Sequence, residues 1–260
     1  MSSSPNEIIK SLQSSHVARV KALHASKGRK SSQQFIAEGP SAVLAALHSN
    51  RFPIRTLYLT ESGAALLPRD LHIETIMLSE KVMAAITTVE NPQGVLAICS
   101  MEDDLRADQV FSDIKLPLVY CLEVNDPGNL GTIIRTADAL GSAGVLLSPG
   151  SADPFSPKVV RATAGSLWQI PVLRDVELHS AISEAKSCGR RIYVTDSAGL
   201  SRLTEVSGVD ALWIFGNEAR GIPQEFSALA DQVVAIPMRG RAESLNLATA
   251  VAITLFHANS

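Results

Sequence analysis

Short apolar runs, each followed by a polar loop, recur along the C-terminal half of the chain. The last two occupy residues 212–215 and 233–236, and an apolar helix is expected at 247–256. Short continuous apolar runs are typical of buried parallel strands. Further elements of the same pattern are expected as strands at 118–124, 144–147, 171–173 and 191–195, and as helices ending near 140 and starting near 156. The pattern predicts an α/β fold with a parallel sheet.

The N-terminal half alternates strand and helix patterns on a smaller scale. Strands are expected at 35–38, 55–60, 73–78 and 94–100, and helices at 6–30, 39–48 and 80–87. This predicts a small α/β sandwich of ordinary domain size. A rival interpretation is a small α/β domain that only supports a dimer.

The composition changes between the two halves. Residues 101–113 carry five acidic side chains against one Arg. We interpret 106–115 as an exposed acidic linker between a first domain, 1–105, and a second domain, 116–260.

Bulk composition limits the class of protein. The chain has 260 residues, 46% hydrophobic content and a formal charge of -3, so any nucleic-acid surface must be local. No apolar run is long enough to span a bilayer, and the first residues lack the pattern of a signal peptide. Cys99, Cys121 and Cys188 are odd in number and far apart, which indicates free thiols in a reducing cytoplasm and no zinc site. We therefore expect a cytoplasmic protein with no membrane segment and no metal.

Two polar loops after predicted strands carry the candidate chemistry. They read GNEARGIP at 216–223 and IPMRGRAESLN at 236–246. In open α/β sheets, ligands bind in loops at the carboxyl ends of the strands. The loop 196–199, after the strand at 191–195, is a third candidate wall. Either of the two main loops alone would also fit a tight turn with solvated charges; together they predict one composite site.

These two loops resemble the second and third motifs of the SpoU/TrmH family. The members of that family are RNA 2′-O-ribose methyltransferases of the SPOUT class. The segment NDPGNLGTIIRTADALG at 125–141 resembles the family's first motif. FIAEG at 35–39 and NPQG at 91–94 resemble the L30e-like substrate-binding domain that precedes many SpoU domains. Departures are small: Ala219 stands where Gly is common, and Leu247-Ala248 replaces a more usual Val-Ser.

The resemblance implies a fold and a cofactor. The second domain would have a SPOUT α/β fold with a trefoil knot and would form a homodimer. The domain that precedes it in the sequence would be an L30e-like α/β sandwich. The cofactor would be S-adenosylmethionine, held largely through main-chain groups, with Ile236 and Leu245 around the adenine. The expected cofactor-binding set is Thr195, Gly216, Asn217, Gly221, Ile236, Met238 and Leu245. For the apolar members, ordinary core packing is the alternative.

The resemblance also implies catalytic residues. The expected set is Asn129, Arg135, Glu218, Ser244 and Asn246. Arg135 would be central, oriented by Glu218 and serving the cofactor pocket of the other subunit. A guanidinium is not expected to lose its proton, so Arg135 would instead grip a substrate phosphate and stabilise the developing alkoxide. The alternative for Ser244 is a helix N-cap, and both roles can hold at once.

RNA contacts are expected outside this site. The basic helix at 6–30 could follow a phosphate backbone, although a solvated helix face would look the same. Lys158 and Arg161 lie about one helical turn apart, and a salt bridge is the alternative for Arg161. The expected RNA-binding set is Arg19, Lys21, Lys158 and Arg161.

The combined interpretation is an S-adenosylmethionine-dependent RNA 2′-O-methyltransferase. The L30e-like domain favours ribosomal RNA over transfer RNA as the substrate. The alternatives are a transfer RNA 2′-O-methyltransferase, an RNA-binding or ribosome-assembly factor whose methylation is lost, and a nucleotide-dependent oxidoreductase. The oxidoreductase lacks its fingerprint, because the glycines at 128–131 do not form G-x-G-x-x-G.

Overall fold

The computed structural model describes residues 8–103 and 106–260. They form two compact units. Unit 1 contains residues 8–103 together with Phe155–Gln169, and unit 2 contains residues 106–154 together with Ile170–Ser260.

Unit 1 is built on a four-stranded sheet in the order β1-β4-β2-β3. β1 and β2 both pair antiparallel with β4, and β3 pairs parallel with β2. The strands are β1 Gln34–Glu38, β2 Ile54–Leu59, β3 Thr75–Met77 and β4 Val95–Ser100, and the helices of residues 8–103 are α1 Ser15–His24, α2 Ser26–Ser32, α3 Pro40–Leu47, α4 Glu61–Ala64 and α5 Glu80–Ile86. The predicted small α/β unit is therefore present, and its strands lie where the apolar pattern places them.

The prediction of a single basic helix at 6–30 is wrong. Residue 9 forms an isolated bridge with Leu78, and the helical stretch is divided at Ala25 into α1 and α2. Arg29 is only 3% exposed, and its Nη1 donates to the carbonyls of Leu23 and His24. One of the basic residues therefore caps α1 from inside the unit and is not part of a solvated face. Residues 6 and 7 lie outside the described residues.

The segment Phe155–Gln169 returns to unit 1 from the second half of the chain. It contains α8 Pro157–Ala162 and the short 3-10 helix η1 Ser166–Trp168. The Phe35 ring of β1 lies 4.8 Å from the Phe155 ring and 5.8 Å from the Trp168 ring, measured between centroids. The domain boundaries expected from the sequence, at 105 and 116, place this segment wholly in the second domain.

Unit 2 is built on a seven-stranded sheet in the order β7-β6-β5-β10-β8-β11-β9, and every pair of neighbours is parallel. Its strands are β5 Leu118–Cys121, β6 Gly144–Leu147, β7 Val172–Leu173, β8 Arg191–Thr195, β9 Ser201–Arg202, β10 Ala211–Phe215 and β11 Gln232–Ala235. The predicted parallel α/β sheet is confirmed. Because all strands run the same way, the loops after β5, β8, β10 and β11 emerge at one edge.

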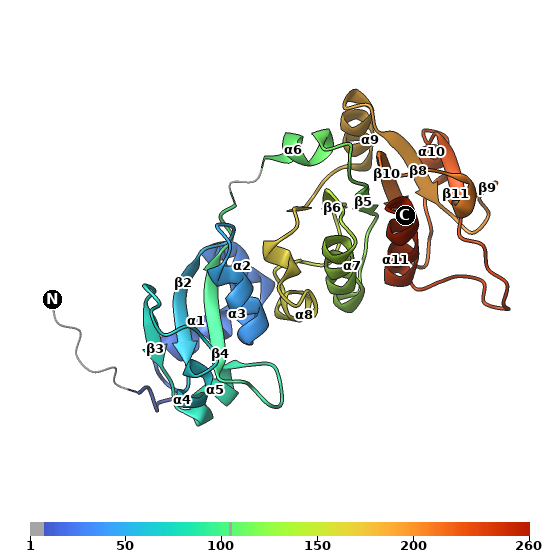
Figure 1. The fold of residues 1–260 in the computed structure, drawn as a ribbon. Helices are drawn as coiled ribbons and strands as arrows, with labels where there is room; N and C mark the ends of the chain where they lie inside the picture. Colours follow the sequence, from blue (N-terminus) through green and yellow to red (C-terminus); the bar gives the residue numbers. More distant parts are fainter. Residues whose placement is uncertain (1–7, 104–105) are drawn as a thin grey trace. The chain divides into compact units, whose positions relative to one another are not determined.

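Helices cover this sheet. They are α6 Ala107–Ser112, α7 Pro127–Ala139, α9 Leu178–Ser187, α10 Gln224–Ser227 and α11 Leu247–Ala258, with a 3-10 turn η2 at Leu203–Glu205. α7 and α11 lie side by side (Figure 1), and the Asn259 side chain donates to the carbonyl of Leu140 at 2.7 Å. This pairing places the starts of both helices near the same edge of the sheet.

The predicted acidic linker at 106–115 is not exposed over its whole length. It contains α6, from which Val110 and Phe111 are buried in the core of unit 2. The buried guanidinium of Arg190 donates to the carbonyls of Phe111 at 2.7 Å and Leu116 at 2.9 Å, and also to that of Asp113. α6 is therefore fastened to the sheet.

Within 8–103 and 106–260, no helix has the length and apolar character needed to cross a membrane. Over the same residues, no group of three His, Cys, Asp or Glu side chains is placed to hold a metal ion.

Candidate active site

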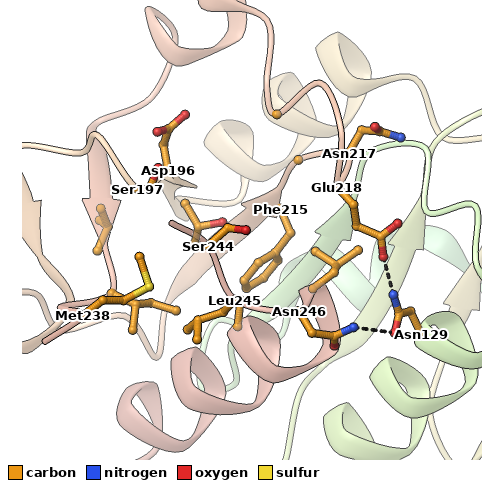
Figure 2. Close-up of a pocket in the computed structure, with 17 residues that line it drawn as sticks. Asn129, Asp196, Ser197, Phe215, Asn217, Glu218, Met238, Ser244, Leu245 and Asn246 are labelled. Carbon is orange, nitrogen blue, oxygen red and sulfur yellow. Dashed lines mark hydrogen bonds between the residues drawn. The ribbon is translucent and has the colours of Figure 1, made fainter. Parts of the chain in front are cut away.

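A cavity of about 560 Å³ lies at the carboxyl edge of the unit 2 sheet. Its walls come from the loops after β8, β10 and β11 and from the first turns of α7 and α11 (Figure 2). The lining residues are Asn129, Thr195, Asp196, Ser197, Phe215, Gly216, Asn217, Glu218, Gly221, Val234, Ile236, Met238, Ser244, Leu245, Asn246, Leu247 and Ala250. All three sequence motifs and the predicted third wall at 196–199 contribute to this lining.

Three polar side chains from the three motifs form one hydrogen-bonded chain. Asn246 Nδ2 donates to Asn129 Oδ1 at 2.9 Å, and Asn129 Nδ2 donates to the Glu218 carboxylate (Figure 2). The two bonds fix which way the Asn129 amide faces, with its oxygen towards Asn246 and its nitrogen towards Glu218. Three of the five predicted catalytic residues are thus brought into direct contact.

The start of α7 positions Asn129. Asp126 is the N-cap, and its carboxylate accepts from the Asn129 main-chain NH at 2.8 Å. Pro127 occupies the first helical turn, where its missing NH costs nothing. The first motif therefore sets the Asn129 side chain at a rigid helix end.

The start of α11 positions Asn246 in the same way. Its Oδ1 caps the helix by accepting from the Thr249 NH at 3.3 Å, which leaves Nδ2 for Asn129. Ser244 lines the cavity but does not cap α11, so the N-cap alternative for Ser244 is wrong.

The loop after β10 is closed by Asn217. Its main chain exchanges hydrogen bonds with Gly221, and its Oδ1 accepts from the NH groups of Ala219 and Arg220. Its Nδ2 donates to the carbonyl of Glu123 at 2.9 Å. Asn217 is only 8% exposed, so its main effect is to hold the shape of the loop. Gly221 has a φ of 65°, a conformation that favours glycine.

Gly216→Ala is expected to weaken cofactor binding at least tenfold. A Cβ at Gly216 would lie 2.5 Å from the Gly221 carbonyl carbon and 2.8 Å from Ile222 Cγ1, so the loop must move. Calorimetry with S-adenosylhomocysteine measures the change without turnover. Gly240→Ala is the matched control, because a Cβ there meets nothing within 4 Å. Equal affinities for the two variants would contradict the prediction.

The cavity combines apolar walls with acidic groups. The predicted Ile236, Met238 and Leu245 lie in it together with Phe215 and Leu247, neither of which is in the expected cofactor-binding set. Val234 and Ala250 were also not among the predicted residues.

The polar part of the lining fits S-adenosylmethionine. Asp196 and Glu218 supply carboxylates. The Thr195 hydroxyl donates to the carbonyl of Ile214 at 3.0 Å. Apolar walls suit a planar adenine, and the carboxylates favour a cationic sulfonium.

Arg135 does not line the cavity of its own chain. It is exposed on α7 and has no hydrogen-bond or ion-pair partner among the described residues. Six residues along a helix correspond to a rotation of about 120° away from Asn129. Within one chain, Glu218 therefore binds Asn129 and does not orient Arg135.

The predicted RNA-binding residues lie in unit 1. Lys21 and Lys158 are exposed, and Arg19 donates to Thr56 at 3.4 Å and Gln34 at 3.2 Å. Their RNA contacts stay a prediction.

Arg161 has protein partners within unit 1. It contacts the buried Glu38 carboxylate at 3.4 Å and donates to Thr88 Oγ1 at 2.9 Å. The salt-bridge alternative thus describes its contacts, and its RNA contact stays a prediction as well.

Comparison with known proteins decides the family. Residues 117–256 match the SpoU rRNA Methylase family. The chain belongs to this family. Residues 14–97 match the MRM3-like substrate binding domain. The match to the SpoU family contains the whole cavity lining, and the oxidoreductase alternative is therefore wrong.

Relatives in the family are similar over almost the whole chain. The Bacillus subtilis (strain 168) 23S rRNA (guanosine(2553)-2′-O)-methyltransferase RlmP is 36% identical over 252 residues, 96% of this chain and 98% of the relative. The crystal structure of an AdoMet-bound rRNA methyltransferase from Sinorhizobium meliloti has a TM-score of 0.85 and 34% identity, with 97% of each chain covered.

A third SpoU relative has also been crystallised with the cofactor. AviRb from Streptomyces viridochromogenes, in complex with AdoMet, has a TM-score of 0.83 and 27% identity, covering 95% of this chain and 97% of the relative.

Proposed function

We propose that the protein transfers a methyl group from S-adenosylmethionine to a ribose 2′-hydroxyl of ribosomal RNA. The observation that carries this is the hydrogen-bonded chain of Asn246, Asn129 and Glu218 beside a cavity with apolar walls. It puts fixed amides and a carboxylate next to a site suited to the cofactor, as required for a reaction at a sugar hydroxyl.

The choice of ribosomal RNA is supported by the relatives. The Bacillus subtilis relative is named a 23S rRNA methyltransferase, and so is one from Streptomyces viridochromogenes that is 32% identical over 220 residues. The match of residues 14–97 to a substrate binding domain adds to this support.

The cofactor would be held by the loops of unit 2. Its bound form supplies a methyl group on a positively charged sulfur. Gly216 and the neighbouring main chain allow close approach, while Ile236 and Leu245 offer apolar surface for the adenine. The carboxylates of Asp196 and Glu218 make the cavity favourable for positive charge.

The chain's own polar groups would prepare the hydroxyl. Asn129 is fixed at a helix end, so it can hold a ribose oxygen with little loss of freedom. Glu218 accepts from Asn129 through one oxygen, which leaves the other to hold a guanidinium. Arg135 would grip a substrate phosphate and stabilise the alkoxide that forms as the hydroxyl loses its proton. The proton would pass to that phosphate or to water, because the guanidinium keeps its own.

We further propose that this guanidinium comes from a second copy of the chain. Arg135 is exposed and outside the cavity of its own chain. On the neighbouring helix α11, Ile253 and Phe256 are 38% and 68% exposed and lie three residues apart. An exposed apolar stripe beside the helix of Arg135 is what a homodimer face would require. The trefoil knot and the cytoplasmic location also stay predictions.

Methyl transfer to RNA tests the proposal. Protein, methyl-labelled S-adenosylmethionine and unmodified 23S rRNA transcript are incubated, and the product is hydrolysed in alkali. A 2′-O-methyl group blocks cleavage at its own nucleotide, so the label should appear in alkali-resistant dinucleotides. Label on a free mononucleotide would mean base methylation. Transfer only to a parallel transfer RNA sample would favour that substrate, and no transfer to any RNA would favour a non-catalytic assembly factor.

A further inference from the structure

The cavity lining, as far as the structure describes it, has acidic groups but no cation that could hold the phosphates of an RNA substrate. The lining contains the carboxylates of Asp196 and Glu218, and no Lys or Arg is among the described residues that form it. A ribose in RNA is flanked by phosphates, which these carboxylates repel. Cations that hold the flanking phosphates must therefore come from outside the lining.

Arg239 and Arg241 are placed to meet that requirement. Both are exposed, and neither has a hydrogen-bond or ion-pair partner among the residues that the structure describes. They stand on the connection between β11 and α11, where Met238, Ser244 and Leu245 line the cavity. The two arginines thus stand in the sequence between residues that line the cavity, and we call this segment, 237–246, the rim loop.

Arg220 is a contrasting case on the loop after β10. It forms an ion pair with Glu123, so its charge is already neutralised. In the segment 237–246 the only acid is Glu243, against two arginines. The rim loop therefore carries net positive charge in a chain whose formal charge is -3.

We propose that Arg239 and Arg241 bind RNA phosphates next to the target ribose, in addition to the phosphate assigned to Arg135. Guanidinium groups pair with phosphate oxygens through two parallel hydrogen bonds, so they set position as well as supplying charge. The assignment rests on the proposed function and adds a substrate-positioning element to it. The carboxylates inside the cavity serve the cationic cofactor, and the arginines of the rim loop serve the anionic RNA.

Salt-dependent RNA binding tests this assignment. The probe is an unmodified 23S rRNA transcript, and the variants are Arg239→Gln, Arg241→Gln and the double variant. Each lost phosphate contact should reduce the slope of log affinity against log salt by roughly 0.7 to 0.9. The double variant should bind the transcript more than tenfold more weakly at low salt, with unchanged affinity for S-adenosylhomocysteine.

Two control variants show whether a change in RNA binding depends on the position of the lost charge and on the paired hydrogen bonds of a guanidinium. Lys115→Gln removes an exposed cation just before β5, at the amino edge of the same sheet, and should leave the slope unchanged. Arg239→Lys keeps the charge but loses the paired hydrogen bonds, so affinity should fall several-fold with the slope preserved.

The outcomes distinguish this inference from the proposed function. If wild-type protein methylates the transcript and the double variant matches it in affinity and slope, the assignment is overturned and the proposed function stands. Loss of S-adenosylhomocysteine binding in the arginine variants would reassign the rim loop to the cofactor. Wild-type protein that transfers no methyl group to any RNA would remove both.

Discussion

Arg135→Ala is expected to lower the rate of methyl transfer by about 100-fold to 1000-fold. This is the usual effect of removing one fixed group that stabilises developing charge. Its affinity for S-adenosylhomocysteine should stay within a few-fold, because Arg135 does not line the cavity of its own chain. Single-turnover rates and calorimetry give the two quantities separately. A large loss of cofactor affinity would show that Arg135 serves the cofactor and not the substrate.

Subunit exchange then asks which copy supplies the guanidinium. Arg135→Ala and Asn246→Ala should each be inactive alone. In a mixed dimer with shared sites, one site receives both defects and the other receives neither. Random exchange makes about half of the dimers mixed, so activity should return to roughly a quarter of wild type. If Arg135 acts within its own chain, no activity returns, and differently tagged subunits verify that exchange took place.

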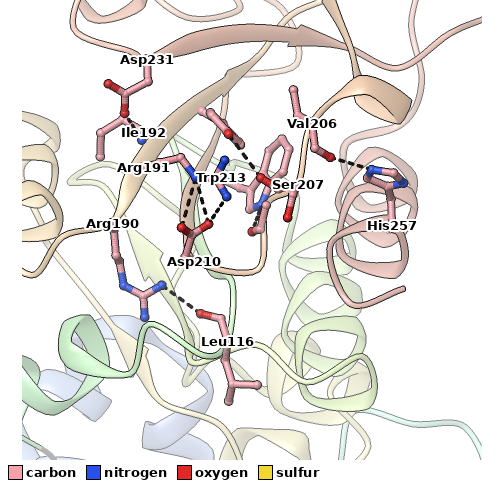
Figure 3. A network of polar contacts seen from close by, with 12 residues as sticks. Leu116, Arg190, Arg191, Ile192, Val206, Ser207, Asp210, Trp213, Asp231 and His257 are labelled. Atoms are coloured by element: carbon pink, nitrogen blue, oxygen red, sulfur yellow. Dashed lines mark hydrogen bonds and ion pairs between the residues drawn. The ribbon is translucent and has the colours of Figure 1, made fainter.

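Arg190→Met is expected to cost about 3–5 kcal/mol of the free energy of unfolding. Arg190 is 3% exposed, and burial lowers the pKa of its guanidinium. It donates to the carbonyl of Phe111 in α6 and to that of Leu116 in the connection to β5, the second of which Figure 3 shows. Its removal leaves several buried acceptors without a donor, as when a buried ion loses its partner. Urea unfolding followed by circular dichroism and tryptophan fluorescence measures the loss.

Its neighbour in sequence is the control. Arg191 forms an ion pair with Asp210, but the two side chains are 40% and 34% exposed (Figure 3). Solvent screens such a pair, and Arg191→Met should cost about 0–1 kcal/mol. Similar losses for both variants would mean that the buried hydrogen bonds of Arg190 contribute no more than a surface pair.

Much of the fold could be predicted because its strands are short apolar runs bounded by polar loops. β6 and β8 have the predicted bounds, and β5, β10 and β11 differ only at their ends. The strand order could not be predicted, since nothing local in a run says which strand it will pair with. The division of the first helix at Ala25 depends on packing: a Cβ on Gly28 would lie 1.9 Å from the carbonyl oxygen of Ala22.

α9 was not predicted, although its sequence carries a helical pattern. Leu178, Ala181, Ile182 and Ala185 are its buried residues, and their spacing places them on one face. Four of its ten residues are Ser or His, types that also occur often in loops, and this weakens the helical pattern.

The polar part of the site could be predicted better than its apolar part. Asn129, Glu218 and Asn246 stand in motifs whose resemblance to a family gives them a role, and the structure joins them. Phe215, Val234 and Leu247 line the same cavity, but in the sequence they are ordinary core positions of a strand or helix. The direction of Arg135 depends on the rotation of α7, which a motif does not specify.

The return of Phe155–Gln169 to unit 1 has a consequence for inheritance. The chain leaves unit 2 after residue 154 and re-enters it at residue 170, so a break near 105 does not free unit 1 from the remainder. A fragment starting there would keep Trp168 and Phe155 but lose the Phe35 ring that they contact. A recombination event that exchanges only the first part of the chain would separate two stretches that pack together in unit 1. Unit 1 is thus expected to be inherited together with the later stretch that completes it.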